Sequence, residues 1–296
     1  MCPMSRWRGA HSVTPPVVAG VNGMSRVELT HDSGSIAHVY LYGAHVTSWI
    51  PVGGRDVFYL SRLARFEQGA GIRGGIPVVF PQFADSGPLP KHGWLRKTEW
   101  LVDPTSGSAE TRARLFTTDS EESRAIWPHG YRAELEVSLD ESSLSVELSI
   151  HNGGSDAFSF TSALHSYFSV ADVRETSIEG LRGASYLDKT TGFSRKVDDE
   201  EKLIVDRETD RVYTGAPREV TLHDHASGTS LGIGVTGFPD IVVWNPWERG
   251  IAELPDMAGD DFLRMVCIEA ALAVTPHTLA PGDRWTGGQR LTVLAT

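Results

Sequence analysis

Cysteine is scarce in this sequence, and long apolar runs are missing from it. The 296 residues include only two cysteines, Cys2 and Cys267, which argues against a disulfide scaffold and against a Cys/His zinc site. No run of about 18 apolar residues is present, so we expect no transmembrane helix and no membrane partner. The N-terminal segment lacks the apolar stretch of a secretory signal, and we therefore expect a cytoplasmic protein.

Basic residues are also in short supply. Lys and Arg total 27 against 38 Asp and Glu, which gives a formal net charge of −11 with histidine neutral. A protein of this sign repels a nucleic-acid backbone, and no run of Lys and Arg compensates. The glycine-rich stretch 71–75 has the residue order of neither a P-loop nor a dinucleotide fingerprint. We expect no nucleic-acid partner, no metal and no cofactor.

Short β-like segments are what the sequence does contain. Residues 135–139 and 144–150 alternate apolar and polar side chains around 140–143, which predicts a hairpin with one buried face. A second hairpin is predicted for 27–30 and 36–41 about the turn at 32–34. Further β-like runs lie at residues 203–205, 220–222, 231–235, 241–244, 265–268 and 291–294.

Helical signals are few, with one or two turns expected at 61–68. Together with 30 glycines and 16 prolines, the spacing of the strands predicts an all-β protein, a large antiparallel sandwich or barrel. No internal repeat, low-complexity tract or linker sequence divides the chain after its N-terminal segment. We expect a loose N-terminal extension over residues 1–22 and a single β-sandwich domain over residues 23–296.

Four segments carry residues suited to chemistry. Arg73 is flanked by glycines that allow close backbone approach, and its alternative is a surface arginine in a turn. Lys91, His92 and Arg96 lie within six positions and are either a cationic site or a solvated loop. Glu269 follows an apolar strand, so a buried carboxylate there needs a partner or a raised pKa and is the best general-base candidate.

His165 lies in an apolar, aromatic strand-like run, where a lone histidine is more often a core residue than a catalytic acid or base. Two other features are weaker. His223, Asp224 and His225 lack further metal ligands at useful spacing. The tryptophans of residues 244–247 suit either sugar stacking or a β core.

Several segments, taken in order, resemble the aldose 1-epimerase (mutarotase) superfamily and in particular its hexose-6-phosphate mutarotase branch. The resemblance runs from residue 42 almost to the C-terminus and rests on an ordered set of motifs: YGAHVTSW (42–49), IRGGIPVVFPQF (72–83), KHGWLR (91–96), ALHSYF (163–168), DRVY (210–213), DIVVWNPW (240–247) and MVCIEAA (265–271). It implies a galactose-mutarotase-like β-supersandwich, in agreement with the all-β prediction.

The resemblance also implies roles. His165 matches the general acid that protonates the ring oxygen of a sugar, and Glu269 matches the general base at the anomeric hydroxyl. The substrate-binding positions that it implies are Arg73, Lys91, His92, Arg96 and Asp210. Lys91 stands where related sequences often carry glutamine, and a cation there favours an anionic substrate further.

The expected activity is therefore interconversion of the α and β anomers of glucose 6-phosphate by a monomer, with proton transfers that need no cofactor. A mutarotase of unphosphorylated hexoses and a non-catalytic sugar-binding module are the alternatives. A glycosidase is disfavoured, because that chemistry requires two suitably spaced carboxylates. In a protein of net charge −11, a phosphosugar site requires Arg73, Lys91 and Arg96 to converge on one cleft, and we predict that they do.

Overall fold

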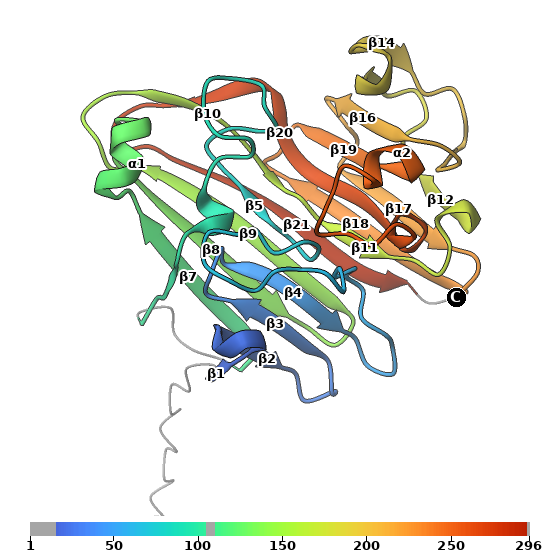
Figure 1. Ribbon diagram of the computed structural model, residues 1–296, viewed down its shortest axis with the longest axis horizontal. Helices are drawn as coiled ribbons and strands as arrows, with labels where there is room; N and C mark the ends of the chain where they lie inside the picture. The colour runs from blue at the N-terminus through green and yellow to red at the C-terminus, as the bar shows by residue number, and fades with distance from the viewer. Residues whose placement is uncertain (1–15, 105–109, 295–296) are drawn as a thin grey trace, which may run out of the picture.

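The computed structural model describes residues 16–104 and 110–294, whose regular structure is almost entirely β-strand (Figure 1). A small antiparallel sheet comes first in the chain. Its strands, in order, are β1 (Val17–Ala19), β2 (Ser25–Thr30), β3 (Ile36–Tyr40) and β4 (His45–Ile50). The predicted hairpin around 32–34 joins β2 to β3, with Val27 opposite Val39.

A nine-stranded antiparallel sheet forms one of the two large layers. Its spatial order is β15 (Lys202–Ile204), β12 (Thr176–Glu179), β17 (Glu219–Asp224), β18 (Thr229–Thr236), β21 (Arg284–Leu294), β9 (Ser143–Asn152), β8 (Tyr131–Leu139), β7 (Arg112–Thr118) and β6 (Leu101–Val102). Alternate residues of β8 are buried along its whole length, as the period-two pattern predicts.

An eight-stranded sheet forms the other large layer and contains the C-terminal motif MVCIEAA (265–271). Its order is β14 (Ser194–Val197), β13 (Ser185–Asp188), β16 (Thr209–Thr214), β19 (Asp240–Asn245), β20 (Met265–Leu279), β10 (Phe158–Leu164) and β5 (Val78–Val79), and β11 (Tyr167–Ser169) also pairs with β20. The strand at residue 265 was expected to stop before Glu269. It runs eleven residues further, to Leu279, because β10 and β19 both pair with its small buried residues 270 and 271.

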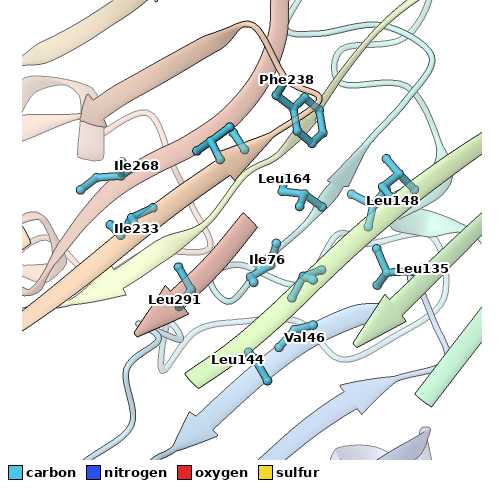
Figure 2. Close-up of a cluster of buried hydrophobic side chains, with 14 of the residues drawn as sticks. Val46, Ile76, Leu135, Leu144, Leu148, Leu164, Ile233, Phe238, Ile268 and Leu291 are labelled. Carbon is cyan, nitrogen blue, oxygen red and sulfur yellow. The ribbon is translucent and has the colours of Figure 1, made fainter. Parts of the chain in front are cut away.

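The hydrophobic core lies between the two large sheets. Leu164 and Ile268 of one sheet belong to the same buried cluster as Leu135, Leu148 and Leu291 of the other (Figure 2). The cluster also takes in side chains of the small sheet and extends in sequence from residue 27 to residue 291. The predicted all-β antiparallel sandwich is therefore confirmed.

Helices are short in the described residues, and none is long and apolar enough to cross a membrane. They are α1 (Glu121–Ile126), α2 (Trp247–Ile251) and the 3-10 turns η1 (Val21–Gly23), η2 (Leu95–Lys97), η3 (Val173–Glu175), η4 (Lys189–Thr191) and η5 (Asp261–Arg264). Sequence analysis missed α1, although Ser120 caps it by accepting a hydrogen bond from the Ser123 amide.

Two expectations about local structure need correction. Residues 61–68 form turns and no helix, because the Ser61 side chain accepts from the Leu63 amide while the Ser61 amide donates to the Arg73 carbonyl. Within the expected extension 1–22, residues 1–15 lie outside the described residues. Residues 17–19 are not loose, since they form β1 and pair with β2.

Candidate active site

One face of the eight-stranded sheet forms the floor of a cavity of about 700 Å3. Successive residues of a strand point to opposite faces. In β20, Ile268 and Ala270 point into the core between the sheets, so Glu269 points the other way, into the cavity. Asp210 of β16 lies opposite Trp244 of β19 in register, and both also line the cavity. The carboxylate predicted at a strand end is therefore fixed in the middle of a long strand.

His165 lies between two strands rather than within one, in a short connection from β10 to β11. Its amide donates to the Pro77 carbonyl at 3.1 Å, and the Ser166 hydroxyl donates to Gln289 Oε1 at 2.6 Å. The imidazole stacks on Tyr167 with 4.9 Å between ring centroids, and Trp244 meets its edge. Backbone and aromatic contacts thus fix the ring toward the cavity floor.

The two candidate catalytic side chains contact each other. His165 Nε2 lies 3.4 Å from Glu269 Oε1; the Glu269 side chain is almost fully buried, and that of His165 is 12% exposed. Their other polar atoms, His165 Nδ1 and Glu269 Oε2, are buried without a hydrogen-bond partner in the described residues. Since buried polar atoms normally have partners, this pair is suited to a ligand that donates and accepts protons.

Burial dominates the electrostatics of the pair. It holds the pKa of His165 well below its usual range, and His92, Arg73 and Arg96 lower it further. It raises the pKa of Glu269 well above its usual range, helped by the Asp210 carboxylate. A proton on the pair is therefore favoured on the carboxyl group while no anion is near.

The cationic side chains predicted to converge do line this cavity, together with others that sequence analysis did not select. Arg73, Lys91 and Arg96 are joined there by Lys97 and Lys189. In the described residues, Lys91, Arg96 and Lys97 form no ion pair. The Arg96 guanidinium donates to the Lys91 carbonyl at 3.0 Å, while its Nε is buried without a partner. Six cationic side chains and five carboxyl groups line the cavity, so its formal charge is 6 − 5 = +1 in a protein of net charge −11.

Arg73 is held more tightly than Arg96. Its guanidinium donates to the Tyr167 hydroxyl at 2.8 Å and lies 3.1 Å from Asp256 Oδ1. The two neighbouring glycines differ in role, since Gly71 lines the cavity whereas Gly74 packs against backbone. Gly74 has φ +109°, and a Cβ there would lie 2.3 Å from the Tyr59 carbonyl oxygen, so glycine permits two backbone segments to pack.

Asp210 and His92 complete the predicted set. Lys189 Nζ lies 2.7 Å from Asp210 Oδ2 and so connects η4 to β16. His92 has a left-handed backbone, with φ 63°, and its Nδ1 accepts from the Ala84 amide at 3.3 Å. Burial and then Arg96 lower the pKa of His92 to about 3, so the neutral ring carries its proton on Nε2.

The cavity gathers all seven residues selected from the sequence: Arg73, Lys91, His92, Arg96, His165, Asp210 and Glu269. Tyr167, Trp244, Lys189 and Asp256 were missed or set aside. Tyr167 and Trp244 had a usable signal, because they lie in the motifs ALHSYF (163–168) and DIVVWNPW (240–247). The 223–225 segment lies elsewhere: Asp224 pairs with Arg55, and no metal-binding cluster occurs in the described residues.

Comparison with known proteins places this arrangement in a family. Residues 25–292 match the family model described as aldose 1-epimerase. A Cenchrus ciliaris protein named "Putative glucose-6-phosphate 1-epimerase" is 35% identical over 275 residues, which cover 90% of this chain and 84% of that protein. A protein of the same name from Escherichia coli (strain K12) is 33% identical over 237 residues, or 79% of this chain and 78% of that one.

A solved structure agrees with these sequence matches. It is a Salmonella typhimurium protein described as a "putative mutarotase", with a TM-score of 0.85 and 27% identity over 95% of this chain and 97% of its own. The mutarotase-like sandwich that the resemblance implied is thereby confirmed. This chain belongs to the aldose 1-epimerase family.

Proposed function

We propose that this protein is a glucose-6-phosphate 1-epimerase, an isomerase that interconverts the α and β anomers of the sugar. The observation that carries the proposal is a buried His165–Glu269 pair on the floor of a cavity lined by unpaired cations. The pair supplies the proton transfers, and the cations supply the preference for a phosphorylated sugar. The names of the two relatives described above point to the same substrate.

The reaction needs one proton delivered and one removed. His165 protonates the ring oxygen while Glu269 takes the proton of the anomeric hydroxyl, so the C1–O5 bond breaks and an open-chain aldehyde forms. Rotation about C1–C2 presents the other face of the carbonyl. Ring closure then returns the proton from Glu269 to the new anomeric oxygen, and His165 recovers its proton from the closing hydroxyl. Each transfer contributes about 10²–10⁴-fold.

Substrate binding prepares the pair for this role. The cations Arg73 and Arg96 disfavour a charged imidazole at His165. A phosphate beside them offsets that positive charge, which raises the pKa of His165 and favours imidazolium with carboxylate over the neutral pair. The anion that gives the substrate its affinity thus also moves the proton to the residue that acts as the acid.

We assign the two ends of the cavity to the two parts of the substrate. Lys91 and Arg96, which lack ion pairs, bind the phosphate. Arg73, His92 and Asp210 bind sugar hydroxyls, because each already has a fixed orientation from a protein partner. His92 presents its Nε2 proton as a donor, and Asp210 presents carboxylate oxygen as an acceptor.

We further propose that residues 23–296 form a single domain, because one buried cluster includes side chains from β2 to β21. In that arrangement both large sheets contribute side chains to the same cluster. The site residues come from segments between residues 73 and 269, so the cavity also depends on the whole sandwich.

The test of the activity is the α/β exchange rate of glucose 6-phosphate, measured by magnetisation-exchange NMR with and without protein. Glucose and galactose serve as comparators. Faster exchange for glucose 6-phosphate, lost in His165→Ala and Glu269→Gln, is the expected result. Faster exchange for glucose and galactose alone would contradict the assignment of a phosphorylated substrate. If the exchange rate of no sugar increased, the enzyme assignment would be contradicted and a sugar-binding protein would remain.

A further inference from the structure

Phe193 is an unusual residue at the mouth of the cavity. Its side chain is 57% exposed, and it is the one large hydrophobic residue of that exposure class among the described residues that lines the cavity. It lies in the hairpin between β13 and β14, at the end of the eight-stranded sheet (Figure 1). An exposed aromatic ring beside a polar cavity is a feature of ligand sites.

The backbone at Phe193 is also strained. Its φ is +62°, directly after Gly192 with φ +70°. Glycine adopts this region freely, whereas a bulky side chain there costs free energy. Neither exposure nor backbone conformation favours phenylalanine at this position. Such strain is found where function requires a particular side chain.

The hairpin that holds Phe193 is anchored at several points. Asp188 accepts from the Thr190 amide at 3.1 Å and from Lys196 Nζ at 2.6 Å. Lys189 Nζ bonds Asp210 on the cavity floor at 2.7 Å. These contacts fix the segment relative to the floor, so the position of the ring at the mouth is a built feature of the fold.

We propose that Phe193 is a substrate-contacting specificity residue whose ring covers the C–H face of the bound hexose ring. This inference rests on the proposed function and adds to it. Charged and polar groups hold the phosphate and hydroxyls, while the aromatic ring takes the apolar surface of the sugar and excludes water from it. Water exclusion strengthens the electrostatic interactions of the site beneath.

The experiment compares Phe193→Ala and Phe193→Tyr with wild type and with Val197→Ala. Val197 is the matched control, an exposed apolar residue of the same hairpin that does not line the cavity. Loss of one aromatic contact is expected to raise the KM of Phe193→Ala for glucose 6-phosphate about threefold to tenfold, with a smaller change in kcat. Phe193→Tyr keeps the ring and is expected to retain the wild-type KM, as is Val197→Ala.

Binding of glucose 6-phosphate is measured for the same four proteins by calorimetry, which separates this inference from the epimerase assignment. A wild type that binds the sugar without accelerating exchange contradicts the epimerase assignment alone, and the weaker binding of Phe193→Ala still tests the contact. Equal KM and affinity in wild type and Phe193→Ala would overturn the inference about Phe193. So would a wild type that binds no glucose 6-phosphate.

Discussion

Replacing Arg96 with glutamine separates the phosphosugar assignment from mutarotase chemistry in general. The guanidinium lines the cavity, forms no ion pair in the described residues, and has a buried Nε without a partner. A charge-assisted hydrogen bond to a phosphate is worth about 1.5–3 kcal/mol. At 1.36 kcal/mol for each factor of ten, kcat/KM for glucose 6-phosphate is expected to fall about 10- to 150-fold.

The same substitution is expected to leave glucose and folding stability almost unaffected. Glucose carries no phosphate, so it forms no charge-assisted hydrogen bond with Arg96 that the substitution could remove. Burial, together with the like charge of Arg73, lowers the pKa of Arg96, which means that the cation is disfavoured where it lies. We therefore expect the Tm of Arg96→Gln to equal or exceed that of wild type.

The assay is anomer exchange for both sugars, with Arg114→Gln as the control. Arg114 carries the same charge but pairs with Glu136 at 2.6 Å on the other large sheet, outside the cavity. An equal loss of activity on glucose and glucose 6-phosphate would refute the reasoning, because Arg96 would then act on the sugar ring. No loss on either sugar would place the phosphate elsewhere.

Three further predictions concern the pair and the fold. His165→Ala and Glu269→Gln each remove most of the catalysed exchange, and the double variant loses little more, as NMR exchange rates will show. Burial lowers the pKa of His165 and raises that of Glu269, which favours the shared proton on the carboxyl group. We therefore expect kcat/KM to fall less between pH 7 and pH 8 than the loss of about eightfold that an acid with the ordinary histidine pKa gives. Gly74→Ala destabilises by more than about 2 kcal/mol in urea denaturation, and Gly34→Ala, where a Cβ meets no atom within 4 Å, costs less.

The strand pattern was readable from the sequence where one face of a strand meets water. In β8 and β9 every second residue is polar, so the hairpin and its buried face followed directly. In β20 both faces are buried, and residues 270–273 are mostly alanine, a residue with little preference for strands. The strand therefore seemed to end before Glu269.

The site was readable only where a motif carried it. His165 and Glu269 lie in recognisable segments, but Lys189 and Asp256 lie in loops with no pattern of their own. Asp256 reaches Arg73 across 183 positions of sequence, and only the folded sandwich brings the two within 3.1 Å. Cations that meet from separate loops leave no local signature, so Lys189 could not be added to the predicted set of Arg73, Lys91 and Arg96.

The cavity lies on the outer face of the eight-stranded sheet, with its back to the hydrophobic core. Glu269 and Ile268 are adjacent in sequence, yet Glu269 lines the cavity whereas Ile268 packs in the core. Loops that surround the floor can therefore diverge without disturbing the packing beneath them. Natural variation in these loops can change which sugar is accepted while the acid–base pair stays in place, so one scaffold can support enzymes of different substrate preference.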